Sequence, residues 1–506
     1  MTRVPKQPTV AVARKRRTPA PPEETFLGMP AFRHGAKNAL ANTQQRRNLR
    51  HATGTIRAKR AAVVGEVADW EGLRRAGEDV KNDVLAHLDS YLVQFEEQFT
   101  KAGGTVHWAS DADEANRIVT DLVRATGADE VVKVKSMATQ EIDLNEALED
   151  AGIAAWETDL AELIVQLGHD RPSHILVPAI HRNRSEVREI FLEEMGRYGT
   201  AAPGDISDSP PELAGAARIH LREKFLRAKV AISGANFAVA ETGTLVVVES
   251  EGNGRMCLTL PETLISVVGI EKILPSVADL EIFLQLLPRS STGERMNPYT
   301  SMWTGGGSGD GPHDVHVVLI DNGRTNALGR LHGRSALRCI RCSACLNICP
   351  VYERVGGHAY GSVYPGPIGA VLTPQLRGIT SDIDASLPYA SSLCGACFEV
   401  CPVRIDIPEL LVQLRHEVVE KKKSHARVPS ANQAIFAGAS WMMADARRLT
   451  AAQKLASAAS RILPKSGHLG PLPWPMSKWS NARDLPNPPA ESFRDWWKRE
   501  HEGGRP

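Results

Sequence analysis

The feature that most constrains this chain is a run of four closely spaced cysteines that ends in proline. The run is Cys339-x2-Cys342-x2-Cys345-x3-Cys349-Pro350. Three thiolates at two-residue intervals can each bind one corner of an iron–sulfur cubane. The fourth, one residue further along and followed by proline, is typically directed to a second cluster. The spacing therefore predicts an iron–sulfur module with further ligands elsewhere in the chain.

A second run supplies those further ligands, in the order Cys394-x2-Cys397-x3-Cys401-Pro402. When the two runs are aligned on their Cys-Pro ends, Ser391 stands where a complete second run would have its first cysteine. Crossed ligation, as in two-cluster ferredoxins, assigns Cys339, Cys342, Cys345 and Cys401 to a first cluster and Cys349, Cys394 and Cys397 to a second. The second cluster is then one thiolate short. Ser391, Ser392, water, a substrate or a partner's side chain could complete it, or it could hold three irons.

Zinc is the alternative metal, because paired Cys-x2-Cys units also form structural zinc sites. Zinc ribbons use separated pairs rather than three cysteines in a row, and they do not require a Cys-Pro ending, so the pattern favours iron and sulfur. Seven of the eight cysteines belong to the two runs, and Cys257 is left over. A long chain of this kind without a signal peptide is typical of a reduced, cytoplasmic protein rather than a disulfide framework.

Length and charge suggest how the rest of the chain is organised. The 506 residues allow about three domains, and no apolar run reaches the roughly 20 residues of a membrane span, although a peripheral membrane contact stays open. Residues 1–60 carry 14 Lys and Arg against two acidic residues. We interpret this stretch as a solvated, partly disordered arm around the Pro-rich segment 18–24. Alternatively, this stretch could contact an acidic partner or anionic lipid, or serve as a transit peptide. Binding to nucleic acid is not expected, because the basic clusters lack interleaved aromatic residues.

Residues 61–330 alternate strand-like and helix-like patterns. Strands are predicted at 105–109, 130–135, 154–158, 174–179, 230–240, 244–249, 264–269 and 316–321. This alternation predicts βαβ units and one mainly parallel sheet. The cysteine runs follow in 331–415, and their long connection, 350–393, favours a helical ferredoxin module over a compact ferredoxin. The last segment, 416–506, is predicted to be helical and is rich in Trp and Pro.

The α/β domain also offers candidates for a substrate pocket, because the strand ends of such sheets form ligand crevices. They are Lys133, Lys135 and Ser136 at one strand end, His174 and His181 around another, and Glu241 in a turn. The alternative is that the lysines are solvated, the histidines satisfy backbone groups and Glu241 caps a turn. The open iron of the second cluster is another possible substrate site, acting as a Lewis acid.

The chain resembles the lactate utilization protein B family, from about residue 70 to its end. The resemblance rests on segments 133–137, 172–175, 178–181, 234–243 and 251–255 and on both cysteine runs. It implies an α/β domain similar to the sugar-phosphate isomerase and CoA-transferase fold, followed by a helical ferredoxin module with two 4Fe–4S clusters. It further implies an electron-transfer subunit that works with other subunits in the oxidation of L-lactate to pyruvate and passes electrons to an unidentified acceptor. The alternative function is an enzyme with its own substrate pocket.

Overall fold

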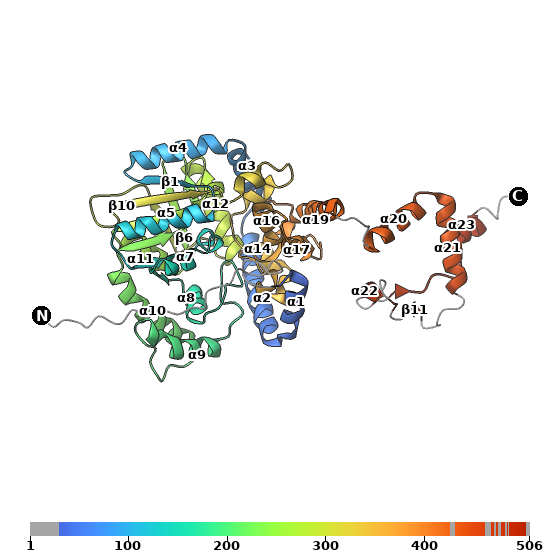
Figure 1. Ribbon diagram of the computed structural model, residues 1–506, viewed down its shortest axis with the longest axis horizontal. Helices are drawn as coiled ribbons and strands as arrows, with labels where there is room; N and C mark the ends of the chain where they lie inside the picture. Colours follow the sequence, from blue (N-terminus) through green and yellow to red (C-terminus); the bar gives the residue numbers. More distant parts are fainter. Residues whose placement is uncertain are drawn as a thin grey trace. The chain divides into compact units, whose positions relative to one another are not determined.

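The computed structural model describes residues 30–425, 431–460, 467–469, 472–473, 477–480, 483 and 485–501. Contacts divide the chain into two units, Met1–Val418 and Val419–Pro506 (Figure 1). The Pro-rich segment 18–24 of the predicted arm lies outside the described residues. Within the described part of the chain, no helix combines the length and the apolar composition that crossing a bilayer requires.

The first unit is built on a six-stranded sheet in which every neighbouring pair is parallel. Its strands, in spatial order, are β1 (Thr105–Ala109), β10 (Asp314–Ile320), β7 (Thr263–Gly269), β4 (Val230–Ser233), β2 (Glu130–Lys133) and β3 (Ala154–Glu157). The predicted parallel sheet of an α/β domain is therefore confirmed.

Both faces of this sheet are buried, which explains why its strands are continuous apolar runs. Successive side chains point to opposite faces: Val132 and Val317 enter one hydrophobic core, while Val131 and Val318 enter the other. The helices that cover and connect the strands are α3 (Trp70–Ala86), α4 (Leu88–Lys101), α5 (Ala112–Ala125), α6 (Met137–Glu141), α7 (Leu144–Asp150), α8 (Leu160–Leu167), α9 (Arg184–Glu194), α10 (Pro210–Arg227), α11 (Asn253–Thr259), α12 (Val277–Ser291) and α13 (Arg324–Leu328).

A second, four-stranded sheet was not expected. Its order is β8 (Ile273–Leu274), β5 (Phe237–Val239), β6 (Thr244–Glu249) and β9 (Tyr299–Trp303), with β6 antiparallel to both of its neighbours. The prediction that 230–240 and 244–249 belong to the single parallel sheet is wrong for β5 and β6. The chain leaves the main sheet after β4, and Phe237, Val239 and Val246 pack into the core that holds the cysteine runs. The second sheet therefore connects the α/β domain to that core.

The cysteine-bearing segment is helical, as predicted. Its helices are α14 (Ala344–Ile348), α15 (Tyr352–Val355), α16 (Gly366–Arg377), α17 (Asp382–Ser386), α18 (Ala396–Glu399) and α19 (Ile407–His425), with the short 3-10 helix η4 at His358–Tyr360. We call this segment the cluster module.

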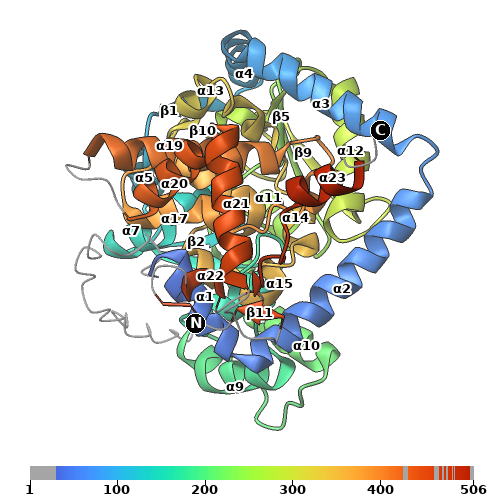
Figure 2. The same cartoon turned by 90° about the vertical axis from the view of Figure 1, so that its right-hand side faces the viewer.

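Residues 32–60 differ from the predicted solvated arm, because they form helices that pack on the cluster module (Figure 2). Helix α1 (Phe32–Ala41) contacts η4, and α2 (Thr43–Gly65) contacts α14 and α15. Leu49 and Thr53 are fully buried on α2, and the Gln45 side chain donates to the Val355 carbonyl at 3.2 Å. Arg47, Arg50 and Lys59 of α2 are exposed, whereas Arg57 and Arg60 are half-buried and bond to the module. Composition alone therefore suggested an arm where an amphipathic helix exists.

The predicted strand at 174–179 is also wrong. This segment is an irregular, buried connection in which the Ser173 carbonyl accepts a hydrogen bond from the Tyr352 hydroxyl at 2.7 Å. Its apolar residues are buried against the cluster module rather than inside a sheet, as Ile175 and Ile180 show. It is therefore the junction between the α/β domain and the module.

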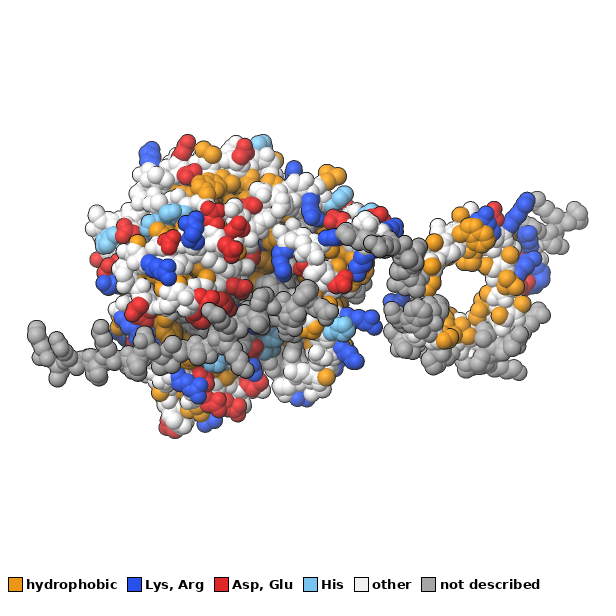
Figure 3. Space-filling model, in the orientation of Figure 1, with side chains coloured by type: hydrophobic (Ala, Val, Ile, Leu, Met, Phe, Trp, Pro, Cys, Tyr) orange, Lys and Arg blue, Asp and Glu red, His pale blue; other side chains and the backbone are white. Residues whose placement is uncertain are grey.

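The second unit is mainly helical, with α20 (Ala431–Met443), α21 (Ala446–Ser460), α22 (Ser477–Ser480), α23 (Phe493–His501) and a short antiparallel pair, β11 (His468–Leu469) with β12 (Leu485–Pro486). The predicted helical C-terminal segment is confirmed. Figure 3 shows hydrophobic side chains on the surface of this unit. The exposed hydrophobic residues of the unit include Phe436, Trp441, Phe493 and Trp497.

Candidate metal centre

The two cysteine runs lie side by side because α14 packs against α18. Each of these short helices follows a residue with a left-handed backbone, Ser343 (φ 61°) before α14 and Gly395 (φ 86°) before α18. Cys345 lies within α14 and Cys397 within α18, while the other cysteines lie in the flanking loops. Local helix formation thus brings together residues that are distant in the sequence.

Four of the cysteines line one small cavity: Cys339, Cys342, Cys345 and Cys401. The first three come from the first run and the last comes from the end of the second, which is the grouping that crossed ligation assigns to the first cluster. The cavity wall is otherwise largely apolar and includes Ile175 from the α/β domain.

The other three thiols form a second set. Burial and the neighbouring thiols of Cys349 and Cys394 raise the pKa of Cys397 to about 12. Cys349 and Cys397 are buried, whereas Cys394 is exposed. The second set therefore reaches the protein surface, whereas the first set is buried apart from the half-buried Cys339.

Ser391, at the place of the absent eighth cysteine, is half-buried near this second set. Its hydroxyl accepts the Leu393 backbone N–H at 3.1 Å, and its carbonyl accepts a hydrogen bond from Arg415 at 3.1 Å. The side chain thus stabilises the turn that leads into Cys394, and it still has a free lone pair and a proton to offer.

The backbone around the cysteines points N–H groups at sulfur. Arg341 donates to Cys339 Sγ at 3.4 Å, Tyr352 to Cys349 Sγ at 3.4 Å and Ile405 to Cys401 Sγ at 3.3 Å. Left-handed backbone at non-glycine positions also concentrates here, at Arg341, Ser343, Leu393 and Arg404. Such conformations cost free energy and persist where a functional site requires them. Here they curl the loops around the sulfurs.

The thiols need positive charge to become ligands. Burial and mutual repulsion raise the pKa of Cys342 and Cys345 well above the usual range of a thiol. Thiolates at these positions are therefore stable only when cations neutralise them, which the irons of a cluster do. The donor set, all sulfur with supporting N–H groups, fits iron–sulfur chemistry.

Several buried polar groups of the described residues lack a hydrogen-bond partner, and three of them are donors of the cluster module: Ser343 Oγ, Asn347 Nδ2 and Tyr360 OH. These three residues are at most 3% exposed, and the Tyr360 hydroxyl lies beside the Cys349 sulfur. A buried, unsatisfied polar group costs about 1–3 kcal/mol. Cluster sulfides and thiolates would supply the acceptors, so the donors are a second observation that fits the group.

Cationic side chains from outside the cysteine runs hold the loop around Cys401. Arg74 on α3 is buried and donates to the carbonyls of Cys401 and Phe398, each at 2.9 Å. Arg60 on α2 donates to the Val400 carbonyl at 3.0 Å. Sequence reasoning missed these residues, because they lie more than 300 positions from their partners and their local pattern is that of ordinary helix surface.

A buried ion-pair network fixes the α/β domain to the module. The carboxylate of Glu271 pairs with Arg324 at 2.5 Å and with Arg341 of the first cysteine run at 3.2 Å. Arg324 also pairs with Glu141 at 2.8 Å, and Tyr364 of the module donates to that carboxylate. The nearby arginines hold the pKa of Glu271 down at about 2, against the opposing effect of burial.

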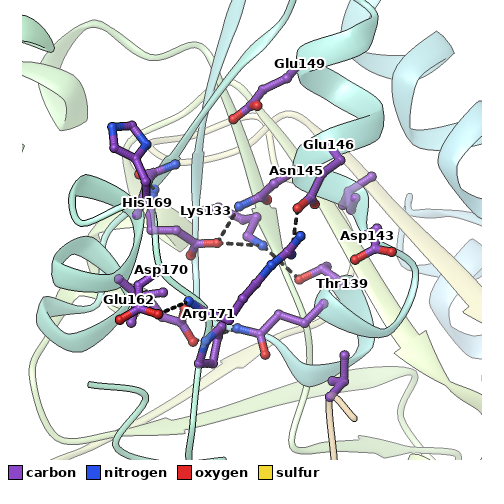
Figure 4. A pocket seen from close by; sticks show the side chains of 17 residues that line it. Lys133, Thr139, Asp143, Asn145, Glu146, Glu149, Glu162, His169, Asp170 and Arg171 are labelled. Atoms are coloured by element: carbon purple, nitrogen blue, oxygen red, sulfur yellow. Dashed lines mark hydrogen bonds and ion pairs between the residues drawn. The ribbon is translucent and has the colours of Figure 1, made fainter. Parts of the chain in front are cut away.

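A separate pocket lies at the carboxyl ends of β2 and β3 (Figure 4). Lys133 pairs with Glu157 at 2.8 Å inside it, and both side chains are buried. Burial and the charge of Glu157 raise the pKa of Glu162. Figure 4 also shows Arg171 reaching Glu146, at 2.9 Å. This is the crevice position that parallel sheets offer to ligands.

The structure gathers only one of the predicted substrate residues, Lys133, into this pocket. Lys135 donates to the Leu176 carbonyl at 2.5 Å, and Ser136 caps α6. Glu241 is exposed and accepts the Val277 N–H at the first turn of α12.

The two histidines lie at the junction. His181 contacts Ser173 and Asp170, each at 2.7 Å, and His174 contacts Asn347 of the module at 3.1 Å. Cys257, outside both cysteine sets, is fully buried in the α/β core.

Fold and site together define a protein that joins a parallel α/β domain to an iron–sulfur module. Family models match in the same order: the LUD domain at residues 92–320, the 4Fe-4S dicluster domain at 335–405 and the lactate utilisation protein B C-terminal domain at 413–502.

Lactate utilization protein B of Oceanobacillus iheyensis is 42% identical over 94% of this chain and 98% of its own length. The protein of the same name from Bacillus subtilis is 41% identical over 93% and 96%. The chain belongs to the lactate utilization protein B family. Among solved structures, a DUF162 family protein from Deinococcus radiodurans is 15% identical with a TM-score of 0.26, covering 46% of this chain and 98% of that one.

Proposed function

We propose that this protein is the electron-transfer subunit of a system that oxidises L-lactate to pyruvate. Two 4Fe–4S clusters relay the electrons. Cys339, Cys342, Cys345 and Cys401 hold the first cluster, and Cys349, Cys394 and Cys397 hold the second, whose fourth ligand is not a cysteine of these runs. Each cluster carries one electron at a time.

The observation that carries this proposal is the grouping of the seven cysteines. The first set lines one small cavity and is buried apart from the half-buried Cys339, and the second reaches the surface at Cys394. A buried cluster beside an exposed one suits a relay, because electrons must leave through a site that a partner can approach. The family name of the relatives supports lactate as the source of the electrons.

Charge in the pocket of the α/β domain disfavours the alternative, an enzyme that binds lactate there. The pocket is lined by Asp143, Glu146, Glu149, Glu157 and Asp170, and by Glu162, whose raised pKa of about 8 favours the neutral acid, against the basic side chains Lys133 and Arg171. Lactate is an anion, and its carboxylate would meet more negative than positive charge. Oxidation of lactate releases two electrons and two protons, so we assign that chemistry to another subunit and the relay to this one.

Iron and acid-labile sulfide analysis of the purified protein tests whether it holds two clusters, with about eight irons per chain expected. Lactate-dependent reduction of a dye tests whether the chain is a relay or an enzyme. The isolated chain should be inactive, and activity should appear when the other subunits of the system are added. Lactate oxidation by the isolated chain would overturn the relay, and a zinc-containing, colourless protein would overturn the clusters.

A further inference from the structure

The junction between the two domains contains a buried hydrogen-bond chain that runs from the α/β domain to the cluster module. His174 of the α/β domain accepts the backbone N–H groups of Leu176 and Val177 at Nδ1, each at 3.1 Å. A neutral imidazole has one donor and one acceptor nitrogen. Since Nδ1 is the acceptor, Nε2 carries the proton and donates to Asn347 Oδ1 at 3.1 Å.

This contact fixes the orientation of the Asn347 amide. Its oxygen is bonded to His174, so its nitrogen, with two N–H groups, points elsewhere. Nδ2 is buried and has no acceptor within the described part of the protein. Burial lowers the pKa of His174 to about 4, so the imidazole is neutral at neutral pH. Its Nε2 therefore remains the donor to Asn347.

The surroundings of the amide point to the second cysteine set. Asn347 lies on α14, two residues before Cys349, which directly follows the end of that helix. The His174 ring packs edge-on against Tyr352, with 5.7 Å between ring centroids, and the Tyr352 backbone N–H donates to Cys349 Sγ. The unpaired amide nitrogen is therefore in the neighbourhood of Cys349 and of the cluster that we assign to it.

We propose that His174 is a positioning residue that holds the Asn347 amide as a hydrogen-bond donor to the second cluster and so raises its reduction potential. Hydrogen bonds to cluster sulfur stabilise the reduced form, which carries one more negative charge. The α/β domain would thereby influence electron transfer without contacting an iron. This inference rests on the two clusters of the proposed function.

The test is a potentiometric titration of the full-length, cluster-loaded protein, followed by electron paramagnetic resonance. His174→Leu and Asn347→Leu should each lower the potential of the second cluster, with iron content unchanged. We expect about a tenfold shift of the reduction equilibrium, which is about 59 mV for one electron. The double variant should show no further shift, because His174 acts through Asn347. His174→Gln, which keeps an N–H donor, should restore most of the potential.

His358→Leu is the matched control. His358 is another histidine of the junction, and its Nε2 bonds to the Arg171 carbonyl at 2.7 Å, so its loss weakens the junction without removing a donor near a cysteine. Its potentials should match the wild type. Unchanged potentials in His174→Leu and Asn347→Leu, or equal shifts in all three leucine variants, would overturn the inference.

A measurement on the wild type keeps the test decisive if a leucine variant loses iron. With asparagine labelled with 15N at the side-chain amide, electron nuclear double resonance of the reduced protein should detect a 15N coupling at the second cluster. Absence of that coupling would overturn the role of Asn347 while leaving the clusters intact. Absence of any cluster signal would instead overturn the proposed function.

Discussion

Replacing Arg74 by methionine should damage the first cluster site without touching a cysteine. Arg74 is buried on α3, and its guanidinium holds the carbonyls of Cys401 and Phe398. Methionine keeps most of the apolar volume but leaves both carbonyls without their donor. The loop that carries Cys401 should then loosen, because this arginine ties it to the helix.

The size of the effect follows from the two hydrogen bonds. A hydrogen bond to a charged group contributes about 1.5–3 kcal/mol, so the pair amounts to about 3–6 kcal/mol. The ion pair of Arg74 with Glu71, at 2.6 Å, adds at most about 1 kcal/mol because Glu71 is exposed. A loss of this size is a large fraction of the 5–15 kcal/mol that stabilises a typical domain.

Urea unfolding followed by circular dichroism measures this loss, and iron analysis measures its consequence for the site. Arg74→Met should lower the unfolding midpoint and the iron content, while Arg75→Met, which changes the exposed neighbour on the same helix, should alter neither. Equal unfolding midpoints for the two variants would refute the view that Arg74 supports the Cys401 loop.

Four further predictions concern single side chains. Cys339→Ser should halve the iron from about eight to about four per chain, and unchanged iron would remove Cys339 from the ligands. Cys257→Ala should leave iron content and electron transfer intact, since this buried thiol behaves as a small hydrophobe; iron analysis checks it. Ser391→Cys should make the second cluster more resistant to oxidative loss of iron and lower its potential, because a thiolate adds negative charge; a spectrum and lability identical to the wild type would show that residue 391 does not reach the cluster. The pKa of His174 falls on folding from an ordinary 6.5 to about 4, so its contribution to stability is present above pH 6.5 and is lost as the pH falls toward 4. Across this pH range, the free energy of unfolding should therefore change less in His174→Gln than in the wild type, by up to about 3 kcal/mol. Parallel curves of unfolding free energy against pH would contradict this.

The iron–sulfur module could be predicted because its cysteines follow one another at short, regular spacings. Cys339, Cys342 and Cys345 lie within one loop and one helical turn, so their geometry depends little on the rest of the chain. The parallel sheet could be predicted for a similar reason, since strands such as β7 and β10 are buried on both faces and read as continuous apolar runs.

Contacts between distant segments could not be predicted in this way. Arg74 and Cys401 become neighbours only when the chain folds. In α2, the many basic residues made the buried face that carries Leu49 hard to recognise in the sequence. The segment 174–179 shows the limit most clearly. Its apolar residues have the pattern of a buried strand, yet they pack against the cluster module, and His174 and Ser173 bond across the junction instead of joining a ladder.

Crossed ligation is the central claim, and pairs of cysteine substitutions test it most directly through iron content. If Cys349 and Cys397 hold the same cluster, Cys349→Ser combined with Cys397→Ser should leave about four irons per chain, as either single change does. Cys349→Ser combined with Cys345→Ser should remove both clusters and leave almost none. The reverse pattern, with four irons left in the Cys345 and Cys349 pair and almost none in the Cys349 and Cys397 pair, would show that each cysteine run holds its own cluster and would contradict the account.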